Sequence, residues 1–159
     1  MTNSKETEKF LQRAMAICAG SEKCRADIEA KLIQWGLDAG ERIKIIEQLM
    51  REKFIDEERY AVAFARDKFR QNKWGRIKIS AMLRMKGLDE SVIRKGINAL
   101  EEDLYTETLK KLIASQKKQI KAANNYELRG KLIRYAVSKG FETDLVYEAV
   151  NELINDNTD

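Results

Sequence analysis

Residues 56–100 read DEERYAVAFARDKFRQNKWGRIKISAMLRMKGLDESVIRKGINAL, and the rest of the chain is organised around this stretch. Its apolar residues recur three and four positions apart, which is the spacing of one face of an α-helix. Gly87 lies where the second helix would end, because glycine adopts a left-handed backbone conformation without steric cost. The stretch therefore predicts a unit of three short helices joined by two turns.

The same pattern occurs three times along the chain of 159 residues, aligned on Gly36, Gly87 and Gly140. Residues at a fixed distance from each glycine are of the same kind, which indicates an internal repeat. Two sets of three precede the glycines: Ser21, Asn72 and Asn125, which we expect to cap the second helices, and Arg25, Arg76 and Arg129, for which we expect a shared structural role such as a salt bridge to the preceding helix.

The repeat predicts an all-α fold of three tandem three-helix units that resemble helix-turn-helix motifs. Units of this size bury little surface alone, so we expect them to pack end to end in an elongated, curved array. No run of alternating apolar and polar residues predicts a strand. The expected domains are 6–51, 56–101 and 104–155, with disordered tails at 1–5 and 156–159. The second domain matches the repeat pattern best and is the most basic.

The composition argues against an enzyme. The chain contains no histidine, so the commonest general base is absent and a metal site would lack ligands; we expect no metal and no cofactor. Cys18 falls on an apolar helix face and reads as a small core residue. The acids at 56–58 fit helix capping better than a metal-dependent nuclease, which is the third hypothesis for function. Without a long apolar run or a signal-peptide pattern, a cytoplasmic protein with no membrane contact is expected.

Positive charge is concentrated in two blocks, each with nine bases and one acid, at 59–86 and 110–139. Helical faces with such a bias commonly serve an anionic partner. Trp74 lies at a turn within the first block, where it either fills a junction or contacts a base or a cation. The expected nucleic-acid or filament contacts are Arg66, Lys68, Arg70, Lys73, Trp74, Arg76, Lys78, Arg84, Lys86, Lys117, Lys118, Lys121, Arg129 and Lys131.

FIDEERYAVAFARDKF at 54–69, followed by KWGRIKISAMLRMKGLDESVIRKGINAL at 73–100, resembles the RecX family of bacterial recombination regulators. The resemblance implies a non-enzymatic protein that binds the RecA recombinase filament on single-stranded DNA. It would lie in the groove of the filament and inhibit recombinase, ATPase and coprotease activities. Binding to duplex DNA would be weak and not sequence-specific, and we expect a monomer.

A second hypothesis follows from the residues alone. Helix, Gly-Leu-Asp turn and helix recur, which is also typical of a helix-turn-helix DNA-binding regulator that acts without a recombinase. Sequence-preferring binding to duplex DNA would favour this alternative.

Overall fold

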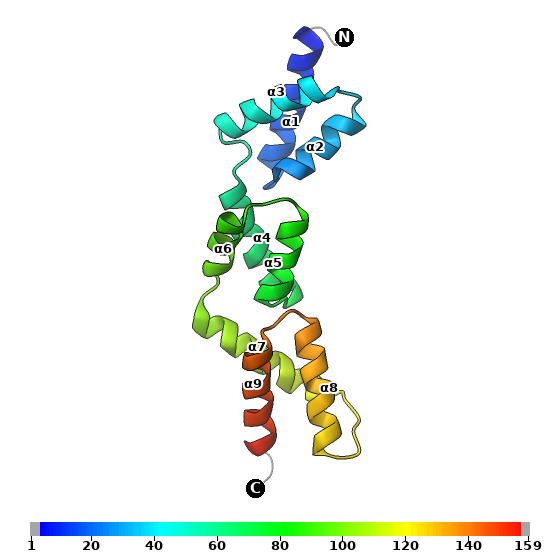
Figure 1. Ribbon diagram of the computed structural model, residues 1–159, viewed down its shortest axis with the longest axis vertical. Helices are drawn as coiled ribbons and strands as arrows, with labels where there is room; N and C mark the ends of the chain where they lie inside the picture. Colours follow the sequence, from blue (N-terminus) through cyan, green and yellow to red (C-terminus); the bar gives the residue numbers. More distant parts are fainter. Residues whose placement is uncertain (1–3, 157–159) are drawn as a thin grey trace. The chain divides into compact units, whose positions relative to one another are not determined.

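The computed structural model describes residues 4–156, and within them it contains nine α-helices and no strand (Figure 1). The prediction of an all-α fold is confirmed. The helices are α1 (Ser4–Gly20), α2 (Arg25–Gln34), α3 (Ala39–Arg51), α4 (Glu57–Asn72), α5 (Arg76–Met85), α6 (Glu90–Asn98), α7 (Glu102–Lys117), α8 (Asn125–Ser138) and α9 (Thr143–Asp156).

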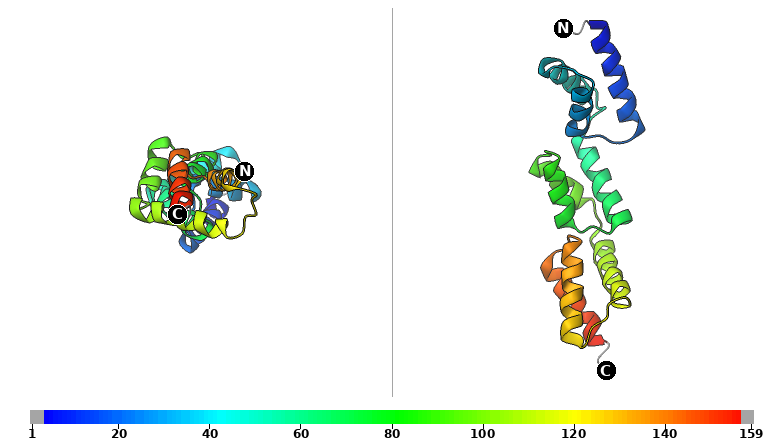
Figure 2. Two further views of the ribbon diagram at one scale, coloured as in Figure 1. Left: turned by 90° about the horizontal axis from the view of Figure 1, so that it is seen from below. Right: turned by 90° about the vertical axis from the view of Figure 1, so that its right-hand side faces the viewer.

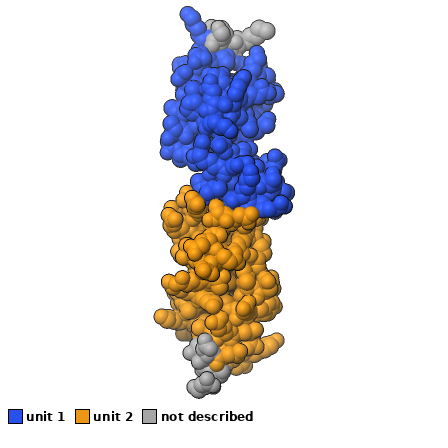
Figure 3. Space-filling view, turned by 90° about the vertical axis from the view of Figure 1, so that its left-hand side faces the viewer, with its two compact units in different colours: residues 1–63, 83–96 blue, residues 64–82, 97–159 orange. Residues whose placement is uncertain are grey.

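The chain forms two compact units (Figure 3). Unit 1 comprises residues 1–63 and 83–96, and unit 2 comprises residues 64–82 and 97–159. The expected domain boundaries at 6–51, 56–101 and 104–155 stay a prediction, as does the expected elongated array. Helix α1 begins at Ser4 and α9 ends at Asp156, so the inner ends of the expected tails are helical; residues 1–3 and 157–159 lie outside the described residues.

Unit 1 has its core where α1, α2 and α3 meet (Figure 2). The apolar faces bury these residues: Leu11, Ala14, Ile28, Leu32, Leu37, Ile45, Ile46, Leu49 and Ile55. Cys18 packs against this core and is half-buried, as its place on the apolar face of α1 predicts. Cys18 and Cys24 are both free thiols.

The glycine that ends each second helix behaves as predicted. Gly36, Gly87 and Gly140 have φ angles of 84°, 82° and 95°, in the left-handed region that glycine enters without strain. Helix α3 begins with a capping box, in which the Asp38 carboxylate accepts from the Glu41 N–H at 2.9 Å. The glycine alignment therefore identifies true helix ends.

The expected N-caps are wrong. Helix α2 begins at Arg25 after Cys24, four residues beyond Ser21. Asn72 is the last residue of α4, and the cap of α8 is Asn124, whose side chain accepts from the Glu127 N–H at 2.9 Å. Ser21 and Asn72 each lie four residues before the first residue of the second helix, because the turn before α2 is longer than a single residue and because α4 continues through Asn72. Asn125 lies one residue after the actual cap of α8.

Unit 2 contains α7, α8 and α9, which pack side by side (Figures 1 and 2). Tyr105 and Phe141 are fully buried, with ring centroids 5.2 Å apart, and Phe69 of α4 stacks on Tyr105 at 5.6 Å. The turn between α8 and α9 is joined to the start of α5 by backbone hydrogen bonds: Gly75 N–H donates to the Lys139 carbonyl at 2.8 Å, and Ile77 N–H donates to the Gly140 carbonyl at 2.9 Å. These bonds fix the basic turn before α5 on the last three helices.

Candidate nucleic-acid interface

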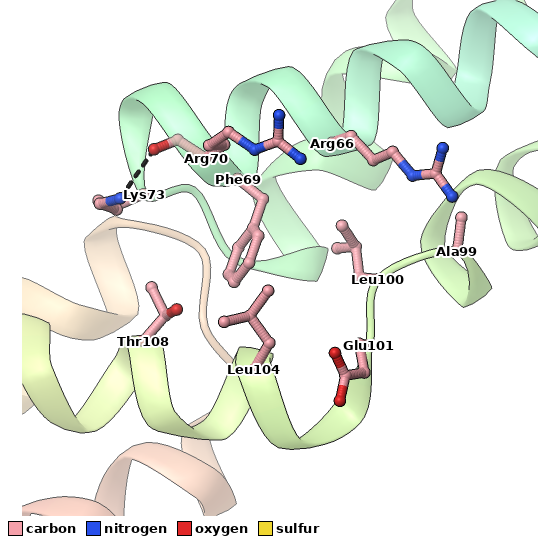
Figure 4. Close-up of a pocket in the computed structure, with 9 residues that line it drawn as sticks. All are labelled: Arg66, Phe69, Arg70, Lys73, Ala99, Leu100, Glu101, Leu104 and Thr108. Atoms are coloured by element: carbon pink, nitrogen blue, oxygen red, sulfur yellow. Dashed lines mark hydrogen bonds between the residues drawn. The ribbon is translucent and has the colours of Figure 1, made fainter.

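A groove in unit 2 gathers three of the predicted basic residues (Figure 4). Arg66, Arg70 and Lys73 follow one another at helical spacing along and just beyond α4, so they share one face. The groove has a volume of about 350 Å³. Its other lining residues are Phe69, Ala99, Leu100, Glu101, Leu104 and Thr108.

The positive charge of this groove is not neutralised within the protein. Arg66 and Arg70 are exposed, and among the described side chains neither lies within ion-pairing distance of a carboxylate. Lys73 is also exposed, and its Nζ donates to the Arg70 carbonyl at 2.8 Å. With Glu101 as the one acid of the lining, the groove can attract an anion.

Lys73 holds an unusual backbone conformation. Its φ is 57°, in the left-handed region that costs a residue other than glycine about 1–2 kcal/mol. The residue follows the last residue of α4, where glycine is the common choice. Lys53 after α3 has a similar φ of 65°, so the conformation ends a helix at both places, and at Lys73 it leaves a lysine in the lining of the groove.

Two lysine side chains lie over the ring of Trp74. Lys68 Nζ lies 5.1 Å and Lys78 Nζ lies 4.6 Å from the centroid of its ring, within the range of a cation–π interaction. The side chain is half-buried at the turn between α4 and α5, as the sequence predicts. The cation contact is therefore present, whereas stacking of Trp74 on a base stays a prediction.

Arg76 is built into the packing of unit 2. Its Nη1 donates to Glu142 and its Nη2 to Glu102, both at 2.7 Å, while its guanidinium lies 3.8 Å from the centre of the Tyr105 ring. Its backbone N–H donates to the Tyr105 hydroxyl at 2.9 Å, and that hydroxyl donates to Glu142. These carboxylates follow Arg76 in the sequence, so the expected salt bridge to a preceding helix is wrong for this residue.

The protonation of this network follows from its surroundings. Burial lowers the pKa of Arg76, but the hydrogen bond and charge of Glu142 outweigh it, so the net pKa is raised. Burial, followed by the hydrogen bond to Glu142, raises the pKa of the Tyr105 hydroxyl. Arg76 therefore stays charged and Tyr105 stays a donor near neutral pH.

We expect Arg76→Gln to destabilise the protein by about 2 kcal/mol, because it leaves the half-buried Glu142 carboxylate without its cation. Arg84→Gln is the matched control, since the Arg84–Glu90 pair is exposed and such pairs add little. Urea unfolding followed by circular dichroism measures both variants. Equal stability of Arg76→Gln and wild type would contradict a structural role for Arg76.

The two basic residues at the end of α5 are paired within unit 1. Arg84 Nε lies 2.5 Å from a Glu90 oxygen, and Lys86 Nζ lies 2.7 Å from Asp27 Oδ1. The hydrogen bond to Asp27 raises the pKa of Lys86 against the opposing effect of burial. Both positive charges have carboxylate partners, so they contribute less to an outer anion contact than the sequence suggests.

The second basic block surrounds the turn between α7 and α8. Lys117 ends α7, and the exposed Lys118 and Lys121 follow it. Lys131 pairs with Glu127 at 3.0 Å and donates to the Lys121 carbonyl at 2.8 Å, so it shapes the loop. Arg129 lies inside α8, and its Nε is buried without a hydrogen-bond partner.

The sequence did not identify the apolar side of the groove. Leu104 is 49% exposed at the start of α7, and Phe69 and Leu100 are buried beside it. All three read as ordinary core positions of amphipathic helices. Only the close approach of α4 and the start of α7 shows that they line a surface with Arg66 and Arg70.

The described helices repeat a three-helix pattern, which defines an all-α repeat protein. Sequence models of the second and third three-helix domains of RecX match residues 56–97 and 102–150, together more than half of the chain. The chain belongs to the RecX family.

Two relatives of this chain carry the name regulatory protein RecX. The chain is 27% identical over 159 residues to the regulatory protein RecX of Clostridium botulinum (strain Eklund 17B / Type B), covering 98% of this chain and 73% of that protein. It is 27% identical over 146 residues to the regulatory protein RecX of Chlorobaculum tepidum (strain ATCC 49652 / DSM 12025 / NBRC 103806 / TLS), covering 92% of this chain and 89% of that protein. Proteins with these names are regulators, which agrees with the expectation of a non-enzymatic role.

A solved structure shares the fold. The crystal structure of RecX from Lactobacillus salivarius superposes with a TM-score of 0.82 at 19% identity, over 96% of this chain and 99% of that one. A crystal structure of regulatory protein RecX gives 0.82 at 22% identity, over 95% of this chain and 72% of that one.

Two features are absent from the part of the chain that the structure describes. None of the helices there has both the length and the apolar character needed to cross a membrane. Among the same residues, no group of three or more acidic or cysteine side chains is arranged to hold a metal ion. Asp56 instead accepts from the Arg59 N–H at 3.0 Å, as capping of α4 predicts.

Proposed function

We propose that this protein binds a RecA recombinase filament on single-stranded DNA and inhibits its recombinase, ATPase and coprotease activities. The anionic contact is made by the groove of Arg66, Arg70 and Lys73, with Lys68 and Lys78 beside it at Trp74. The family resemblance supports the recombinase as partner and a cytoplasmic location. The protein acts as a monomer without cofactor or catalysis.

One observation carries this proposal: the groove bases lack carboxylate partners, whereas Arg76, Arg84 and Lys86 have them. Unbalanced positive charge costs self-repulsion, so its retention at one surface favours an anionic ligand. Among the predicted contact residues, the proposal therefore favours those whose positive charge is not paired with a carboxylate of the protein. Arg76 was predicted from the sequence to be a contact residue, but in this proposal it stabilises the packing of unit 2.

Titration of the protein into a recombinase on single-stranded DNA tests the proposal through the rate of ATP hydrolysis. We expect inhibition near one protein per binding site, with apparent affinity falling about tenfold when salt is raised about threefold, as for three phosphate contacts with single-stranded DNA. Hydrolysis that is unchanged at stoichiometric protein would contradict the proposed function. Tight, sequence-preferring binding to duplex DNA without recombinase would support the helix-turn-helix alternative instead.

A further inference from the structure

Tyr126 is an exposed aromatic residue that the proposed function does not use. It lies in the first turn of α8 and is 85% exposed, the highest value among the large hydrophobic side chains of the described residues. Tyr105, by contrast, is completely buried in the same unit. An aromatic ring kept in water has a free face available for stacking.

Gly130 and Arg134 follow Tyr126 on the same face of α8, one and two helical turns later. A glycine inside a helix costs about 1 kcal/mol relative to alanine. A Cβ at Gly130 would lie 3.3 Å from Arg134 Nη1, so the guanidinium lies across the space that glycine leaves open. Gly130 thereby lets Arg134 lie close to the helix, about 6 Å from the Tyr126 turn.

This face of α8 has positive character. Arg134 is exposed, and none of the carboxylates described for residues 5–155 pairs with it. The nearby acid Glu127 is engaged, since it pairs with Lys131 at 3.0 Å and accepts from the Ala123 N–H at 3.1 Å. Lys118 and Lys121 add exposed charge in the loop that leads to the helix.

An exposed ring one turn from an unpaired guanidinium matches the chemistry of a nucleotide, which has a flat base and an adjacent phosphate. Bases stack on aromatic side chains and arginine when they are unpaired, whereas a duplex conceals their faces. We propose that Tyr126, Gly130 and Arg134 form a binding site for single-stranded nucleic acid. The site goes beyond the proposed function, because it requires no recombinase and lies outside the groove of Arg66 and Arg70.

Fluorescence anisotropy with a labelled oligothymidine, as a single strand and annealed to its complement, tests the site without recombinase. We expect wild type to prefer the single strand, and Tyr126→Ala to weaken that binding about tenfold. Tyr126→Phe keeps the ring and binds within about twofold of wild type. The matched control is Tyr147→Ala on α9, which removes another exposed tyrosine of unit 2 and leaves binding unchanged.

Arg134→Gln gives a second and independent readout. Glutamine is a good helix former, so helical content is kept, but the loss of the guanidinium removes the charged partner of the phosphate and weakens single-strand binding severalfold. Wild-type affinity in Tyr126→Ala, an equal loss in Tyr147→Ala, or equal binding of the duplex would overturn the site. Inhibition of a recombinase is a separate measurement, so either proposal can fail while the other stands.

Discussion

The variant with Arg66, Arg70 and Lys73 all replaced by glutamate is expected to lose inhibition of the recombinase and to keep its helical content. These side chains are exposed around one groove, so their reversal turns attraction for an anion into repulsion. Charge pairs across interfaces contribute about 1 kcal/mol or more each, so half-inhibition should require at least a ~100-fold higher concentration. Arg76 is excluded from this variant, because its reversal would disturb Glu142 and Tyr105.

The control variant carries Lys9→Glu, Lys31→Glu and Lys44→Glu. These lysines are exposed on α1, α2 and α3, and their replacement changes the net charge by the same amount. The control is expected to inhibit ATP hydrolysis nearly as well as wild type at moderate salt. Similar losses in both variants would show that total charge, and not the groove, is responsible.

The largest loss of stability is expected for Gly140→Ala. A Cβ there would lie 2.3 Å from Lys78 Cβ and 2.6 Å from the Lys78 nitrogen, at a φ of 95°. Steric overlap and left-handed strain together should cost about 3 kcal/mol or more. Because the Gly140 carbonyl also accepts from the Ile77 N–H, the backbone hydrogen bond between this turn and α5 should break.

Gly36→Ala and Gly87→Ala test this explanation at equivalent positions of the other repeats. Both glycines have the same left-handed φ, but no atom lies within 4 Å of an added Cβ. We expect each to cost only about 1–2 kcal/mol, from backbone strain alone. Urea unfolding measures all three variants, and equal losses would refute the role assigned to the close contact at Lys78.

Much of the fold could be predicted because its signals are local. A glycine must follow the last turn of α2, α5 and α8 for steric reasons, and the Asp38–Glu41 capping box needs only residues three apart. The start of α2 was missed because the stabilising contact there is the Asp27 carboxylate accepting from the Cys24 N–H at 3.2 Å, and cysteine is not a usual cap.

The site was less predictable because charge pairing is a tertiary property. Arg76 finds partners 26 and 66 residues later in the chain, and Lys86 pairs with Asp27, which precedes it by 59 residues. The basic block at 59–86 therefore contains some bases that pair with carboxylates of the protein and others that do not. The sequence alone does not distinguish the two kinds. Leu104 joins the groove for a similar reason, since its neighbours Arg66 and Arg70 come from a distant helix.

Co-sedimentation of the protein with a recombinase filament assembled on single-stranded DNA measures directly whether the groove binds the filament. Wild type and the Lys9, Lys31 and Lys44 control should sediment with the filament, whereas the Arg66, Arg70 and Lys73 variant should remain in solution. The same measurement with recombinase alone and with single-stranded DNA alone shows how much of the binding requires the assembled filament. Sedimentation of the groove variant to the same extent as wild type would contradict the proposed role of the groove.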